Sequence, residues 1–200
     1  MQINSLIFNP LSANRQNTQT ASNEYYIAQA GDSVWKIANA NKISLSELIA
    51  ANPQIADPNL IFTGQKIRIP SPNTTADSME DEVAHLVNAQ RQKQGIAALR
   101  INRQLGHVAR YKSENMKKNN FFDHISPTFG TPFEMIRDFG INFNTAAENI
   151  AKGQQSAQGV VLSWMNSQSH RANILNPDFT ETGIGYTDGS MPYWTQMFIG

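Results

Sequence analysis

The feature that most constrains the fold is a short polar break between two self-contained hydrophobic patterns. Residues 71–78 read Ser-Pro-Asn-Thr-Thr-Ala-Asp-Ser, a run of turn formers that predicts a linker. Residues 24–70 carry the first pattern, and residues 79–200 carry a second that is long enough for an ordinary domain. Residues 1–23 are rich in Asn, Ser, Gln and Thr and predict a flexible arm.

Charge balance, cysteine content and hydrophobic runs exclude several classes of partner and of chemistry. Lys plus Arg and Asp plus Glu are equal at 16 each, which argues against nucleic acid or anionic lipid as the main partner. There is no cysteine, so neither disulfides nor a thiol nucleophile is available. No apolar run approaches the ~20 residues that span a bilayer, and no signal peptide is recognisable. We therefore expect either an unusual secretion route or a protein that reaches its site from inside, as in a spore shell.

The first pattern predicts the order strand, helix, helix, strand. Residues 25–28 read as a strand, and Ser33 is placed to cap a helix that begins at Val34. A second apolar stripe near residues 45–49 predicts the next helix, and the alternation of residues 66–69 predicts the closing strand.

This segment resembles a LysM domain over residues 25–70. The matching residues are Gly31-Asp32-Ser33-Val34-Trp35-Lys36-Ile37-Ala38, Leu48-Ile49-Ala50-Ala51-Asn52-Pro53, Leu60-Ile61 and Gly64-Gln65-Lys66-Ile67-Arg68-Ile69-Pro70. The resemblance implies binding of N-acetylglucosamine (GlcNAc) glycans, such as peptidoglycan or chitin, between the loop after the first strand and the loop after the second helix. The implied glycan-binding residues are Gly31, Asp32, Ser33, Asn52, Pro53, Gln54 and Ile55. Alternatively, these are only turn and core residues, because turns select the same residue types.

The second pattern predicts an α+β layered domain in which helices frame late strands. Helices are expected near residues 79–94 and 105–116, and the capping box Thr131-Pro132-Phe133-Glu134 opens a shorter one. Another helix is expected from Ser156, followed by a hairpin over residues 183–198.

Three polar segments in this half bear His124, Glu148 and His170, each followed by apolar residues that would anchor it. Two imidazoles and one carboxylate can supply three ligands to a zinc ion and leave one position open. They can equally relay protons, because imidazole titrates near neutral pH. The trio is therefore a candidate catalytic or metal site, and zinc is the one cofactor that it suggests.

Residues 79–200 resemble the bacterial branch of the CAP superfamily of cysteine-rich secretory proteins, antigen 5 and pathogenesis-related proteins. The matching residues are Phe122-Asp123-His124-Ile125-Ser126-Pro127, Glu148-Asn149-Ile150-Ala151, Trp164-Met165-Asn166-Ser167, His170-Arg171-Ala172-Asn173-Ile174-Leu175, Gly183-Ile184-Gly185 and Tyr193-Trp194-Thr195-Gln196-Met197-Phe198. The resemblance implies an α-β-α sandwich whose central cleft holds two His and two acidic residues, with zinc in some members. His124, Glu148 and His170 match three of these, but neutral Asn166 or Ser167 stands where the second acid is expected.

Nearby serines offer another reading. Ser126, Ser167 and Ser169 lie beside the His segments, so a Ser–His pair could imitate a catalytic triad. Serines beside helix starts are more often caps, and Ser167 stands where a cap for the His170 segment would be.

Three functions remain open. The first is a cell-wall or spore-envelope protein of a Gram-positive bacterium that binds peptidoglycan or chitin-like GlcNAc glycans and presents the cleft to a ligand or an envelope protein partner. The second is a metal-dependent or acid–base hydrolase or protease of the wall. The third is a structural spore-coat assembly protein. We favour a non-enzymatic binding protein, and the hydrolase is the runner-up.

Overall fold

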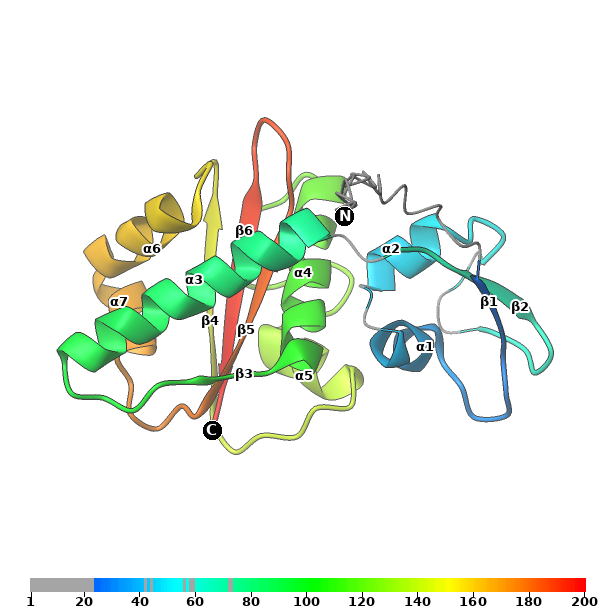
Figure 1. Ribbon diagram of the computed structural model, residues 1–200, viewed down its shortest axis with the longest axis horizontal. Coiled ribbons are helices and arrows are strands. Elements are labelled where there is room, and N and C mark those ends of the chain that lie inside the picture. Colours follow the sequence, from blue (N-terminus) through cyan, green and yellow to red (C-terminus); the bar gives the residue numbers. More distant parts are fainter. Residues whose placement is uncertain (1–23, 42, 44, 56, 58–59, 72–73) are drawn as a thin grey trace, which may run out of the picture.

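The computed structural model describes residues 24–200 except residues 42, 44, 56, 58–59 and 72–73, and these form two modules (Figure 1). The arm predicted over residues 1–23 lies outside the described residues. We refer to residues 24–70 as the N-terminal module and to residues 74–200 as the C-terminal module. Among the described residues, no helix combines the length and apolar character that crossing a bilayer requires.

The N-terminal module has the predicted order of elements. Strand β1 (Glu24–Ile27) pairs antiparallel with β2 (Lys66–Ile69), and helices α1 (Val34–Ala40) and α2 (Leu45–Ala50) lie between them in the chain. The predicted cap is confirmed, since the Ser33 hydroxyl accepts a hydrogen bond from the backbone N–H of Lys36 at 3.2 Å. Fully buried apolar side chains, including Val34, Leu48 and Ile67, form the core.

A four-stranded mixed sheet is the centre of the C-terminal module. The strands β3 (Arg100–Ile101), β4 (Ala146–Lys152), β5 (Glu181–Tyr186) and β6 (Tyr193–Ile199) lie in the order β3-β5-β6-β4. Only the β3–β5 pair is parallel among these pairings, and β5 and β6 form the predicted hairpin. All seven residues of β6 are buried, as expected for a central strand covered on both faces.

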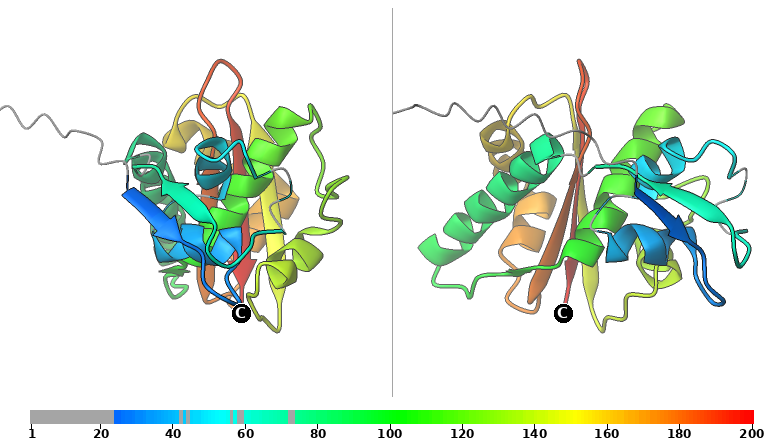
Figure 2. Two further views of the ribbon diagram at one scale, coloured as in Figure 1. Left: turned by 90° about the vertical axis from the view of Figure 1, so that its right-hand side faces the viewer. Right: turned by 45° about the vertical axis from the view of Figure 1, so that its right-hand side comes forward.

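Helices cover both faces of this sheet, which confirms the α+β class. One face carries α3 (Thr74–Lys93), α6 (Ala157–Asn166) and α7 (Gln168–Ile174), and the other carries α4 (Arg103–Lys118) and α5 (Pro132–Asp138) (Figures 1 and 2). The predicted capping box opens α5, where Thr131 and Glu134 bond each other's backbone N–H groups. The helices and sheet thus form three layers, with α4 and α5 between the sheet and the N-terminal module (Figure 2).

Two glycines let α4 lie directly on β5. A Cβ atom added to Gly183 would overlap the backbone of Leu105 and Gly106, and one added to Gly185 would overlap that of Ala109 and Arg110. The Gly-Ile-Gly sequence is therefore a packing requirement: it allows a helix to approach a strand more closely than any side chain would permit.

The start of α3 differs from the linker predicted over residues 71–78. Residues 74–78 belong to the helix. Ala76 is 5% exposed, and the carboxylate of Asp77 pairs with Arg110 of α4. These tertiary contacts order a segment whose own composition is typical of a linker, so the connection between the modules is shorter than predicted.

The two modules contact each other through α1 and α2 on one side and α4 and α5 on the other. The rings of Trp35 and Phe139 meet edge to face with centroids 6.0 Å apart. The carboxylate of Glu47 lies 3.8 Å from the guanidinium of Arg110. The ring of Trp35 therefore packs across the boundary between the modules. Buried side chains of both modules join in one apolar cluster.

Candidate functional site

The structure brings His124 and Glu148 into direct contact. His124 lies in the segment that follows α4, and Glu148 lies on β4, the edge strand next to β6. The Nδ1 atom of His124 is 2.7 Å from Oε1 of Glu148. A carboxylate only accepts hydrogen bonds, so Nδ1 carries the proton. The His124 side chain is 50% exposed and that of Glu148 only 1%, so the imidazole is the accessible member of the pair.

A buried lysine of α4 supports this pair, and the sequence alone did not single it out as part of the site. The Lys112 side chain is fully buried on α4, and its ammonium group donates to the backbone oxygen of His124. Burial lowers the pKa of Lys112, while the nearby carboxylates of Glu148 and Asp123 oppose this effect. Lys112 thus fixes the backbone of the His124 segment and places a positive charge near Glu148.

His170 is placed next to the pair through two asparagines. The Asn149 amide donates to the backbone oxygen of His170 at 3.2 Å. The Asn173 amide donates to the side-chain oxygen of Asn149 at 2.9 Å and to the backbone oxygen of Glu148 at 3.4 Å. Asn173 therefore ties its segment to β4. The contacts bind α7 to β4, so Glu148 and His170 keep a fixed relation.

The pKa values of the two imidazoles are shifted in opposite directions. The hydrogen bond to Glu148 raises the pKa of His124, because it stabilises the protonated ring. Burial, and then the positive charge of His124, lower the pKa of His170. The charge of His124 therefore acts on His170, and the two shifts favour protonation of His124 over protonation of His170. Two imidazoles whose pKa values are moved apart in this way suit acid–base chemistry.

The geometry does not favour a metal ion at this trio. Within the described ranges, no three His, Cys, Asp or Glu side chains are grouped so that they could hold a metal. Nδ1 of His124 is already used by Glu148, although Oε2 of Glu148 is buried without a hydrogen-bond partner. The zinc interpretation therefore stays a prediction without geometric support. The three side chains also line none of the four hollows described for this molecule.

The neighbouring serines have structural contacts. The hydroxyl of Ser126 is buried, donates to Asn115 at 2.9 Å and accepts from two backbone N–H groups. Ser167 occupies the predicted cap position of α7 but makes no capping bond, and its hydroxyl lies 3.3 Å from that of Ser169. Among the described residues, none of these hydroxyls forms a hydrogen bond with an imidazole of the trio, so a serine–histidine pair has no support.

In the N-terminal module, the predicted glycan-binding residues of the first loop build a tight turn. The Asp32 carboxylate accepts hydrogen bonds from the Gln29 N–H at 2.7 Å and the Tyr26 hydroxyl at 2.9 Å. These two bonds, that from Gln29 first, lower the pKa of Asp32. Gly31 has a φ of 85°, a backbone conformation that glycine adopts without strain. Ser33 caps α1, and the ammonium group of Lys36 donates to the backbone oxygen of Gly31, so much of this loop already bonds within its own module.

In the second loop, only part of the predicted set is accessible. Asn52 is fully buried, and its amide bonds the backbone of Leu48 and Arg68 and the side chain of Gln54 at 2.7–3.0 Å. It has no polar atom left for a sugar. Pro53 and Gln54 are exposed, and Ile55 is 6% exposed.

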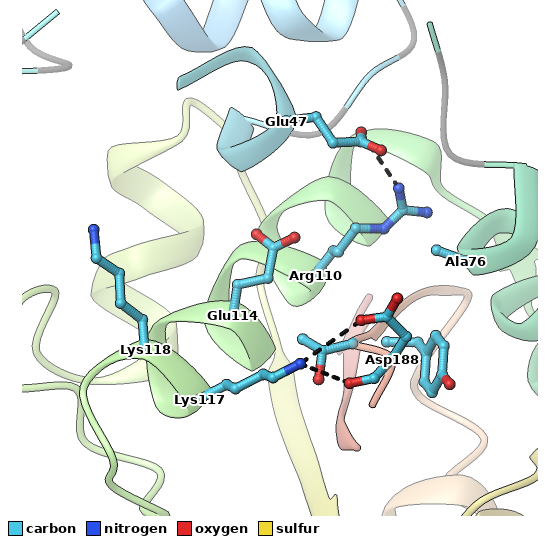
Figure 3. A pocket seen from close by; sticks show the side chains of 9 residues that line it. Glu47, Ala76, Arg110, Glu114, Lys117, Lys118 and Asp188 are labelled. Atoms are coloured by element: carbon cyan, nitrogen blue, oxygen red, sulfur yellow. Dashed lines mark hydrogen bonds and ion pairs between the residues drawn. The ribbon is translucent and has the colours of Figure 1, made fainter. Parts of the chain in front are cut away.

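Two hollows lie where the modules meet. The first, which we call the intermodule hollow, has a volume of about 690 Å³. Its walls are Ile49, Ala50, Pro53 and Ile55 of the N-terminal module and, opposite them, side chains of α4 together with Thr128. The second measures about 390 Å³ and shares Glu114 and Lys118 with the first as lining residues (Figure 3). Its charges are largely paired with each other, Arg110 with Glu47 and Lys117 with Asp188.

Comparison with known proteins agrees with both parts of this architecture. The model of the cysteine-rich secretory protein family, CAP, matches residues 84–198, and that of the LysM domain matches residues 26–70. The chain belongs to the CAP family and carries a LysM domain ahead of its CAP domain. We therefore call the N-terminal module the LysM domain and the C-terminal module the CAP domain.

Three bacterial proteins illustrate the similarity. YkwD of Bacillus subtilis, described as an uncharacterized protein, is 53% identical over 127 residues, which are 64% of this chain and 49% of YkwD. A crystal structure of an extracellular protein containing a SCP domain from Bacillus anthracis is 30% identical, with a TM-score of 0.60 over 68% of this chain and 46% of that chain. SpoIVD-associated factor A of B. subtilis is 44% identical over 46 residues, 23% of this chain and 12% of that protein. The chain thus spans about half or less of these relatives.

Proposed function

We propose that this protein binds peptidoglycan or a related GlcNAc glycan through its LysM domain and uses the His124, Glu148 and His170 trio of its CAP domain to hold a ligand or a protein partner. The observation that carries the proposal is the joining of both domains in one chain, which by itself indicates a cell-wall-associated protein. Zero formal net charge suits a neutral or zwitterionic ligand better than a polyanion.

The place of action that we propose is the cell wall or the spore envelope. The similarity of a LysM-sized stretch to SpoIVD-associated factor A supports the spore, and the likeness to an extracellular SCP-domain protein supports the outer side of the cell. In either place, binding to the wall would hold the CAP domain close to its partner and raise its effective concentration.

Cosedimentation with purified peptidoglycan tests the proposal. The intact chain should pellet with the polymer, and Pro53→Glu should weaken this because it puts a charge on the exposed loop. The matched control is Gln92→Glu, at another exposed position, on α3 of the CAP domain. Deletion of residues 24–70 should abolish binding. An intact chain that stays in the supernatant would refute the proposal.

A wall hydrolase is a second candidate, favoured by the opposite pKa shifts of His124 and His170. In this role His124 would donate a proton to a leaving group, while neutral His170 would accept one from water. Digestion of peptidoglycan should then be lost in His124→Ala and kept in His85→Ala, which changes an exposed histidine of α3. Equal turnover by His124→Ala and the parent would exclude this trio as an active site.

A further inference from the structure

We propose that a glycan chain held by the LysM domain runs on into the intermodule hollow, where α4 of the CAP domain supplies one wall of the binding surface. The ligand class is an oligosaccharide of acetamido sugars. This inference rests on the proposed glycan binding and extends it. In the proposed function only the LysM domain binds the glycan, whereas here the CAP domain also contacts the sugar.

The LysM wall of the hollow is continuous with the loop predicted to bind glycan. Pro53 and Ile55 belong to that loop and also line the hollow. Asn52 is a polar residue of this loop that was predicted to bind glycan. All hydrogen-bonding positions of its side-chain amide are already used within the LysM domain. The loop therefore offers apolar surface but few polar side chains, so a bound sugar needs hydrogen-bond partners from elsewhere.

The CAP wall offers such partners. Asn115 of α4 is 8% exposed, and its side-chain oxygen accepts from Ser126 at 2.9 Å. Its amide nitrogen donates to none of the described residues, and Asn115 is one of the residues that line the hollow. Lys118, one turn further along α4, is exposed and pairs with no described residue. Amide and ammonium donors suit the carbonyl oxygen of an acetamido group.

The apolar side of the hollow matches the other half of the same group. Ile49, Ala50, Pro53 and Ile55 face the donors of α4 across it. The carbonyl carbon of an acetamido group carries a methyl group and an oxygen atom. The methyl group suits the apolar wall, and the oxygen can accept a hydrogen bond from the donors of α4. The volume of about 690 Å³ lies within the range of about 300–1,000 Å³ that is usual for small-ligand sites. The smaller hollow is less suitable, because its ion pairs already satisfy one another.

Binding of a GlcNAc hexasaccharide to the full chain, measured by calorimetry, tests the inference. Thr128→Trp fills the hollow from the CAP side without changing the LysM domain, and Lys118→Ala removes one donor. Each should weaken binding, Thr128→Trp by about tenfold, the effect of losing one or two net polar contacts. The matched control is Thr180→Trp, which adds the same indole at an exposed position before β5 and should bind like the parent.

The Asn115 side-chain amide gives a readout that does not depend on a substitution. Its NMR resonances in the full chain should shift on addition of the hexasaccharide and stay in place for Asn88, whose amide is already bonded to Leu99. Parent-like affinity of both hollow variants, with an unmoved Asn115 amide, would overturn the inference while leaving wall binding intact. If the parent binds neither the hexasaccharide nor peptidoglycan, both proposals fall.

Discussion

Replacing Arg110 by methionine should destabilise the protein by about 3–5 kcal/mol, because it leaves a buried carboxylate without its charge partner. The Arg110 side chain is 4% exposed and that of Glu80 is 7% exposed. Nε of Arg110 donates to Oε1 of Glu80 at 2.6 Å, and a second nitrogen bonds the other oxygen. Without the guanidinium, the backbone N–H of Tyr186 at 3.0 Å is the remaining donor recorded for this carboxylate among the described residues.

The same helix provides a matched control. Arg103 pairs with Asp81, but their side chains are 60% and 36% exposed, so Arg103→Met should cost less than about 1 kcal/mol. Replacing Glu80 and Arg110 together should recover most of the loss, since no buried charge remains. Urea unfolding followed by tryptophan fluorescence measures the free energies, and the melting temperature of Arg110→Met should fall by about 10 °C. If Arg110→Met unfolds within about 1 kcal/mol of Arg103→Met, the reasoning about burial is wrong.

Three further predictions concern the packing glycine, the candidate site and the LysM loop. Gly185→Ala should cost about 1–3 kcal/mol or more in urea unfolding because its methyl overlaps the backbone of α4, whereas Gly106→Ala, 3.4 Å from its nearest neighbour, should cost far less. His124 should titrate above the usual ~6.5 by NMR, and Glu148→Gln should lower that pKa. The contribution of the His124–Glu148 pair to the free energy of unfolding is complete below pH ~6.5 and is lost as the pH rises through the raised pKa of His124. The difference in stability between the parent and Glu148→Gln should therefore shrink at alkaline pH. A difference that does not change with pH would contradict this. Asn52→Ala should lower the free energy of unfolding of the LysM domain by about 1–3 kcal/mol, because it removes buried hydrogen bonds. Native-state hydrogen exchange measures this, and Gln54→Ala should change that free energy very little.

Local signals in the sequence were sufficient for most elements. The cap at Ser33 and the capping box of Thr131 and Glu134 each depend on a few adjacent residues, and both form as predicted. Strand β4 gave no such signal, because its sequence Ala-Ala-Glu-Asn-Ile-Ala-Lys alternates poorly and is made a strand by pairing with β6. The helical start of α3 likewise depends on a partner, Arg110, that is 33 residues from Asp77.

The candidate site could be predicted only in part. No spacing rule joins His124 to Glu148, and only the family resemblance placed them together. Lys112 carried a usable signal, since it falls on the apolar stripe of α4 with Leu105, Val108 and Met116, where a lysine must find a buried acceptor. The contact between the two domains carried none: Trp35 and Phe139 are ordinary aromatic residues by composition, and nothing in either domain's own pattern reveals that they meet.

Helix α4 contacts the sheet, the His124 segment and the LysM domain. Its sequence explains how one helix can make all three contacts. The face that bears Ala109 lies on Gly183 and Gly185, so the helix sits at a fixed height above the sheet. From that position Lys112 reaches the His124 segment, while Arg110 reaches Glu47 of the LysM domain. A glycan lodged against Asn115 and Lys118 would therefore touch the same helix that supports the His124–Glu148 pair. Because Ser126 bonds Asn115 and lies two residues after His124, the hollow and the candidate site border on the same segment of the chain.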